Sequence, residues 1–116
     1  MDRIQNVTQA INRLYDMLRR GSEKAPLSFE QLTVAGTAVA LPSIPALATY
    51  AVVTLESTVT SGIVVRTIEG ETPTASVGMP KSHLDSWDII GYDNLVATRL
   101  IQAQVATNVL NITYYK

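Results

Sequence analysis

His83, the only histidine of the chain, follows Ser82 and precedes Asp85, and these three residue types perform acyl transfer in hydrolytic enzymes. Residues this close in sequence rarely meet in the geometry of a triad, and no Gly-x-Ser-x-Gly segment presents a nucleophilic serine. One histidine with scattered carboxylates and no cysteine also offers no recognised spacing of metal ligands. We therefore expect His83 to be an ordinary loop residue, and we expect no catalytic residue, no metal and no cofactor.

Glu69 and Glu71 flank Gly70, and a pair of carboxylates could act as general acid and base on a glycosidic bond. Both residues fall in a segment rich in turn-forming residues, where a solvated charge is the ordinary explanation. We expect a chain that is not an enzyme.

A small group of aromatic and acidic residues could hold a sugar. Trp87 and Tyr92 are close in sequence to Asp85, Asp88 and Asp93, and sugars bind to an aromatic platform beside a few carboxylates. The alternative is a tryptophan buried in the core of a small domain. Trp87 and Tyr92 are the candidate residues for a glycan.

Arg66 stands out among the charged residues because Val64 and Ile68 share its face in a regular strand. Arginine often pairs with a carboxylate of a neighbouring chain at an interface. The sequence leaves two interpretations of Arg66, a subunit boundary or a strand edge with the guanidinium in water.

Five apolar residues near the start of the chain recur at alternating intervals of three and four residues. Such a heptad repeat keeps a narrow seam on one side of a helix, which packs against the seam of an identical chain. β-Branched residues at both core positions favour three or more chains over two, so we predict a homotrimeric coiled coil. The alternative is a helix docked on its own domain, because two heptads are few. The seam consists of Ile4, Val7, Ile11, Leu14 and Leu18.

Capping signals delimit this predicted helix. Asp2 can accept from the first free amides and Gln5 can reach back to it, while Gly21 can adopt the left-handed conformation that ends a helix. The predicted organisation is a heptad helix at 1–21, a short linker at 22–26 and a β domain at 27–116.

The β domain is recognised by short runs rich in valine and threonine, separated by glycine and proline. Residues 105–115 are the best patterned, with Leu110, Ile112 and Tyr114 on the face that we expect in the core. No second stretch shows a helical period. The fold class predicted is mainly β, a small antiparallel β-sandwich resembling a jelly roll. Its strands are expected at 27–41, 50–56, 62–68, 75–79, 87–90, 95–103 and 105–115.

The net charge of -1 gives no electrostatic footprint for nucleic acid or for an anionic membrane. No stretch approaches the roughly 20 consecutive apolar residues of a membrane-spanning helix. We expect a soluble protein that binds neither nucleic acid nor membrane.

The second half of the chain resembles small structural proteins of tailed-bacteriophage virions, of the head-decoration and head-fibre kind. The resemblance rests on an Ala-Val-Val-Thr-Leu-Glu-Ser strand, an arginine strand that runs into Glu-Gly-Glu-Thr-Pro-Thr, Gly-Met-Pro, a Gly-x-x-x-Leu element, and a final Leu-Asn-Ile-Thr-Tyr-Tyr-Lys. Glu69-Gly70 stands where the pattern has Asp-Gly. These segments are residues 51–57, 69–74, 78–80, 91–95 and 110–116.

This resemblance implies a β-sandwich displayed in several copies on a phage particle, made in the host cytoplasm and localised in the virion. The implied function is a homotrimeric capsid-decoration or head-fibre component that binds and stabilises the shell or anchors a fibre. Its partners would be itself and other virion proteins. The alternative is a receptor- or glycan-binding module of a tail or fibre.

Overall fold

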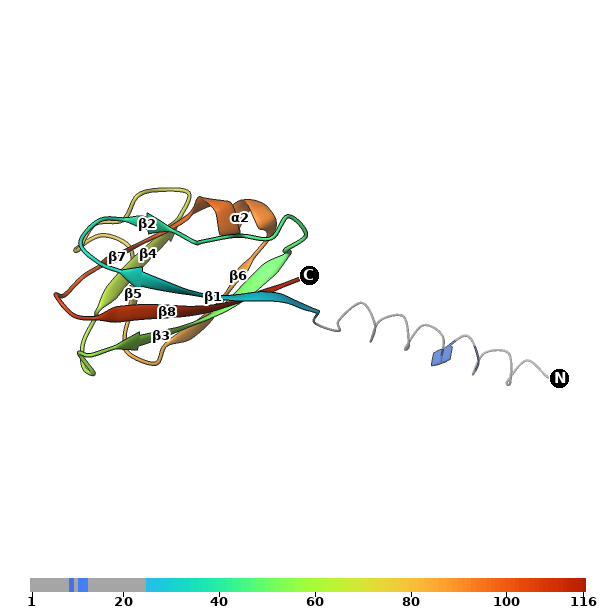
Figure 1. Cartoon of the computed structure of the whole chain (residues 1–116), viewed down its shortest axis with the longest axis horizontal. Helices are drawn as coiled ribbons and strands as arrows, with labels where there is room; N and C mark the ends of the chain where they lie inside the picture. Colours follow the sequence, from blue (N-terminus) through green and yellow to red (C-terminus); the bar gives the residue numbers. More distant parts are fainter. Residues whose placement is uncertain (1–8, 10, 13–24) are drawn as a thin grey trace.

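The computed structural model describes Gln9, Ile11, Asn12 and residues 25–116 (Figure 1). The predicted helix at 1–21 and most of the linker lie outside the described residues, apart from Gln9, Ile11 and Asn12, which have helical backbone and are exposed. The coiled coil stays a prediction. The first strand begins at Pro26, the last residue of the predicted linker.

The rest of the chain forms two antiparallel sheets of four strands each, which confirms the prediction of a mainly β fold (Figure 1). Sheet A has the order β1-β8-β3-β6, and sheet B has the order β2-β7-β4-β5. The strands of sheet A are β1 (Pro26–Val34), β8 (Asn108–Tyr115), β3 (Tyr50–Ser57) and β6 (Ser86–Ile90). The strands of sheet B are β2 (Val39–Ala40), β7 (Thr98–Gln102), β4 (Val65–Glu69) and β5 (Met79–Lys81).

The strand pairs are nested in the sequence. β1 pairs with β8, β2 with β7, β3 with β6 and β4 with β5, all antiparallel. The chain therefore follows the path of one long hairpin whose two arms wind together across both sheets. Within sheet A the pair β3–β8 joins β1–β8 to β3–β6, and within sheet B the pair β4–β7 joins β2–β7 to β4–β5.

The core lies between the sheets and is built by alternation. In β8, Leu110, Ile112 and Tyr114 are fully buried, as the pattern of this strand predicted. In β7, Leu100 is fully buried and Ile101 is half-buried, so this strand has one core face. The buried apolar side chains are Val34, Leu41, Ala48, Ala51, Val53, Leu55, Val64, Val65, Ile89, Leu95, Leu100, Leu110, Ile112 and Tyr114.

Tyr114 brings one polar atom into this core. Its hydroxyl donates a 2.6 Å hydrogen bond to the backbone oxygen of Pro42, in the connection after β2. Burial, with a smaller contribution from the negative charge of Glu30, raises the pKa of Tyr114 to about 12. The phenol therefore stays neutral and donates over the whole physiological range.

Two local predictions are wrong. The segment predicted as one strand at 95–103 contains the end of helix α2 (Tyr92–Ala97) and then β7, because six residues are too few to show a helical period. Residues 75–78 form a loop with an isolated bridge between Thr74 and Val77, and the strand begins only at Met79. No helix in the described part of the chain is long and apolar enough to span a bilayer.

Candidate functional site

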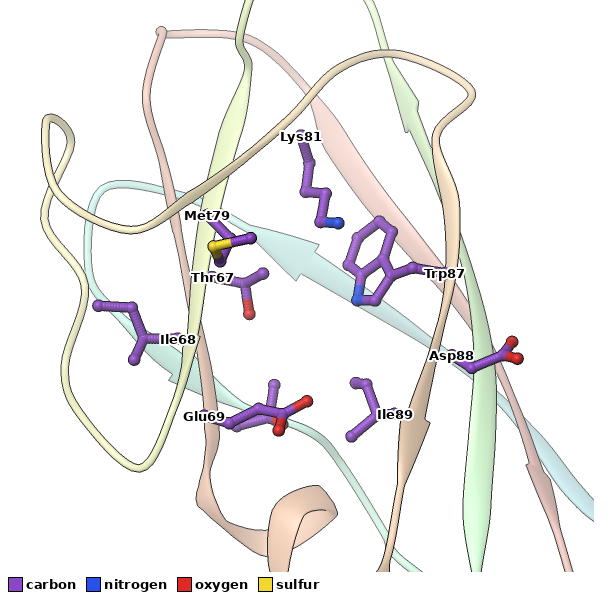
Figure 2. A pocket seen from close by; sticks show the side chains of 9 residues that line it. Thr67, Ile68, Glu69, Met79, Lys81, Trp87, Asp88 and Ile89 are labelled. Atoms are coloured by element: carbon purple, nitrogen blue, oxygen red, sulfur yellow. The ribbon is translucent and has the colours of Figure 1, made fainter.

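A cleft opens at the side of the sandwich, between the edge strand β6 of sheet A and strands β4 and β5 of sheet B (Figure 2). Its volume is about 360 Å³, at the lower end of the range found for ligand sites. Because the lining residues come from paired strands on both sides, their positions are fixed by the sheets. The cleft is lined by Thr67, Ile68, Glu69, Met79, Lys81, Trp87, Asp88, Ile89 and Thr98.

Trp87 forms the apolar wall of this cleft. It is half-buried and shares the inner face of β6 with the buried Ile89, since side chains two residues apart point the same way. The ammonium of Lys81, on β5, lies 4.3 Å from the centroid of the indole ring, which is a cation–π contact. Figure 2 shows Met79 and Thr67 on the opposite side of the cleft.

The polar groups of the cleft divide into two kinds. The hydroxyl of Thr67 donates to the backbone oxygen of Arg99 at 3.0 Å, so it is already occupied within the fold. By contrast, the indole N–H of Trp87 and the carboxylate of Glu69 make no hydrogen bond or ion pair with any described residue. Asp88 points away from the cleft (Figure 2). The groups without a hydrogen bond or ion pair among the described residues are therefore the indole N–H, the carboxylate of Glu69 and the ammonium of Lys81, which contacts only the indole ring.

Trp87 and Tyr92, which the sequence proposed as one sugar site, do not meet at this cleft. Tyr92 is the first residue of α2, with 43% of its surface exposed, and it does not line the cavity. The residues that join Trp87 are Lys81, Met79 and Glu69, which come from other strands. Their contact with Trp87 depends on the packing of the paired strands β4 and β5 of sheet B beside β6 of sheet A, and no local sequence signal gives it.

The residues considered for catalysis are not assembled into a catalytic group. The Nδ1 atom of His83 accepts a 3.0 Å hydrogen bond from the backbone N–H of Ser57. The carboxylate of Asp85 accepts from the backbone N–H of Ser82 at 2.8 Å, and no hydrogen bond within residues 25–116 joins Asp85 to His83. His83 therefore holds a connection against the end of β3.

Glu69 and Glu71 face different hollows. Glu69 lines the cleft with Trp87, whereas Glu71 lines a more open hollow of about 340 Å³ beside Val96 and Arg99. The two carboxylates therefore do not face one bound substrate from opposite sides. No group of three or more metal-ligating side chains occurs among the described residues.

Arg66 holds the loop that precedes β5. Its Nε donates to the backbone oxygen of Ala75 at 3.1 Å, and its Nη1 donates to that of Gly78 at 2.9 Å. Gly78 has a φ of 140°, and a Cβ there would lie 3.1 Å from the Cβ of Arg66 and 3.2 Å from that of Pro73. Within one chain Arg66 therefore positions Met79 and the cleft wall, and its predicted role at a subunit boundary stays a prediction.

A second surface feature lies on the outer face of sheet A, at the end where β1 begins. In one row across the four strands, Tyr115 on β8 lies opposite Pro26 on one side and Tyr50 on the other, and Tyr50 lies opposite Ile90. The rings of Tyr50 and Tyr115 stack with centroids 4.9 Å apart and planes inclined by 6°. Ile90 is 70% exposed. This row therefore contains two aromatic and two aliphatic residues and no charged one.

The next rows change from apolar to polar along the strands. Phe29, which is 59% exposed, lies in the second row with Val52. In the third row Gln31 donates to Asn111 at 2.8 Å, and Asn111 donates to Glu56 at 3.2 Å. We call the apolar part, Phe29, Tyr50, Val52, Ile90 and Tyr115, the aromatic end of sheet A.

The aromatic end lies beside the point where the N-terminal segment joins the domain. The backbone N–H of Lys116 donates to the oxygen of Ala25 at 2.9 Å, and the C-terminus lies next to the start of β1 (Figure 1). Of the predicted seam, Ile4, Val7, Leu14 and Leu18 lie outside the described residues, and Ile11 is exposed. The alternation of residues 109–115 places Tyr115 on the outer face of its strand, but no local sequence signal gives its stacking against Tyr50.

Comparison of the chain with protein-family models, with curated proteins and with solved structures finds no match in any of the three.

Proposed function

We propose that this chain is a structural protein of a bacteriophage virion, which forms a homotrimer and binds the capsid shell or anchors a fibre. The observation that carries the proposal is the position of the aromatic end of sheet A. Its exposed apolar side chains, Phe29 and Ile90, lie at the end of sheet A where β1 begins, Phe29 on β1 and Ile90 on the opposite edge strand β6.

The position favours contact between copies of the chain. A coiled coil of three helices holds its chains within about 10 Å of one another, so the domains that follow a short linker must meet close to the axis. The described domain begins at the end of sheet A that carries Phe29 on β1 and Ile90 on the opposite edge strand β6, so this end is the surface that we propose to meet its copies. Burying such side chains gives roughly 1.5–3 kcal/mol each as an upper value. The seam and the domains would then contribute to the same assembly.

The nested order of the strand pairs supports a jelly roll, the finer form of the predicted fold. Eight strands in two sheets with this connectivity are found in viral capsid proteins and in lectins. This support is an analogy between folds and does not by itself assign an activity. Together with the resemblance of residues 51–116 to head-decoration and head-fibre proteins, it favours a place on the virion.

Sedimentation equilibrium of the full chain tests self-association. We expect a particle with three times the mass of one chain. Replacing two seam residues, Ile11→Asp with Leu14→Asp, should give monomers, because a buried unpaired carboxylate costs several kcal/mol. The matched control is Asn12→Asp, which adds a carboxylate off the seam and should leave the trimer intact. A monomeric wild-type chain would contradict the proposal.

Immunogold labelling of phage particles, with antibodies raised against the chain, tests the place of action. Label over the shell is the expected result for a decoration or head-fibre component. Label confined to the tail would favour the receptor-binding alternative, and particles without label would remove the virion role.

A further inference from the structure

The cleft between β6 and the β4–β5 pair has the properties of a binding site that the proposed structural role does not use. Trp87, Met79 and Ile89 give it apolar walls, and each stands on a strand that is paired to a neighbour. A site built on paired strands is more rigid than a site built on loops, which lowers the ordering cost of binding.

The charges of the cleft indicate a neutral ligand. Lys81 and Glu69 contribute one charge of each sign, and no described residue forms an ion pair with either of them. Asp88 points away from the cavity (Figure 2). Because these two charges have opposite sign, they leave no net charge that would select an anion or a cation, whereas a neutral ligand with several hydroxyl groups can hydrogen-bond to both.

The hydrogen-bonding groups of the cleft that have no partner in the fold also indicate a neutral ligand with hydroxyl groups. The indole N–H of Trp87 and the ammonium of Lys81 can donate to hydroxyl oxygens, and the carboxylate of Glu69 can accept from a hydroxyl hydrogen. The indole offers an apolar surface for the C–H groups of a ring once the ammonium of Lys81, which lies 4.3 Å from the ring centroid, turns from the indole to a hydroxyl of the ligand. A sugar has both properties, because its ring presents C–H groups on its faces and hydroxyls around its rim.

We infer that the cleft formed by Trp87, Lys81, Glu69 and Met79 binds a neutral saccharide. Trp87 is the platform, and Lys81 and Glu69 bind hydroxyl groups from opposite sides. The inference does not depend on the trimer or on the virion, since all of these residues belong to one domain of one chain. It replaces Tyr92 of the sequence-based proposal with three residues from β4 and β5.

Fluorescence titration tests the inference directly, because Trp87 is the only tryptophan of the chain and therefore reports on the cleft alone. The probes are glucose, galactose, N-acetylglucosamine and their disaccharides, with glucuronate and glucosamine as charged comparisons. Titration of the full chain to about 10 mM detects dissociation constants in the millimolar range. We expect saturable changes with at least one neutral sugar and weaker binding of its charged relative.

The variants keep the tryptophan and differ by one functional group. Glu69→Gln should weaken binding of the neutral sugar about tenfold, because a charge-assisted hydrogen bond becomes a neutral one. The matched control is Glu71→Gln, two residues away and facing the other hollow, which should bind like the wild type. Thermal melting confirms that both variants are folded.

The possible results are distinct. The absence of a saturable change with every neutral sugar overturns the inference, as does tighter binding of glucuronate or glucosamine than of the neutral sugars. Equal affinities of Glu69→Gln and Glu71→Gln would place the sugar outside the cleft. None of these outcomes affects the sedimentation of the chain. Failure of the saccharide inference can therefore be distinguished from failure of the proposed trimer.

Discussion

The hydrogen-bond partners of Arg66 could be identified only from the three-dimensional structure. Its type and its place between Val64 and Ile68 drew attention to it, but its partners are backbone oxygens nine and twelve residues away. Those partners lie in a loop at 70–78, where the sequence predicted a strand from residue 75. The guanidinium has rigid, divergent donors, so it can hold two points of a loop at once, which a lysine ammonium does less well.

Tyr114 gives a prediction about pH. Its pKa is raised from 10.0 to about 12 by burial and by the charge of Glu30. The unfolded chain therefore loses this proton first, and the stabilisation that is fully present below pH 10 is lost as the pH rises to about 12. Tyr114→Phe should cost about 1 kcal/mol at neutral pH through the lost bond to Pro42.

Urea denaturation at several pH values checks the prediction. The free energy of unfolding of the wild type should fall more steeply between pH 10 and 12 than that of Tyr114→Phe, which lacks the titrating group. Comparing the two slopes removes the contribution of other groups that titrate there. Parallel slopes would show that the phenol of Tyr114 titrates normally in the folded chain.

At the scale of elements, the sequence predicted most strands and missed α2, the one helix within residues 25–116. The strands predicted at 50–56, 87–90 and 105–115 correspond to β3, β6 and β8, because a period of two residues is a local property. Helix α2 has less than two turns, so its apolar residues cannot repeat at the helical period. It is stabilised by the burial of Leu95 and by the hydroxyl of Thr98, which donates to the oxygen of Asn94 at 2.7 Å.

The helix therefore depends on one side chain. Leu95 is fully buried, and α2 packs against β3, β4 and β6. Leu95→Ala should lower the free energy of unfolding by about 2–4 kcal/mol, since it leaves a cavity between both sheets. Val96→Ala is the matched control, because Val96 is exposed, and it should change stability by less than about 0.5 kcal/mol. Urea denaturation monitored through the Trp87 fluorescence gives both values, and similar losses would mean that α2 is not anchored by Leu95.

At the scale of the molecule, the winding of the strands could not be predicted from the sequence. The pattern of short strands predicted a sandwich, but the nested pairs join residues as distant as Phe29 and Thr113. The packing of the complete core selects such pairs. Several strand orders would bury the same apolar faces, and the sequence alone does not distinguish them. For the same reason neither the cleft at Trp87 nor the aromatic end of sheet A was visible as a unit, although the sequence did single out Trp87 as a candidate for ligand binding.

The aromatic end leads to a prediction about assembly. If it forms the contact between domains, Phe29→Thr with Ile90→Thr should weaken trimer formation by roughly 1.5–3 kcal/mol per side chain that becomes buried. Threonine keeps the preference for strands and removes most of the apolar surface. The matched control is Val105→Thr, because Val105 is 90% exposed in the β7–β8 connection, at the opposite end of sheet A from Pro26 (Figure 1).

Sedimentation equilibrium of the full chain measures the effect. We expect the double variant to dissociate at concentrations where the wild type and Val105→Thr remain trimeric. If the double variant associates as tightly as the control, the seam alone holds the trimer and the aromatic end is free to bind a different virion protein. If both seam and aromatic end are required, neither is sufficient alone, because two heptads are marginal for a coiled coil and the domain offers only a narrow apolar surface.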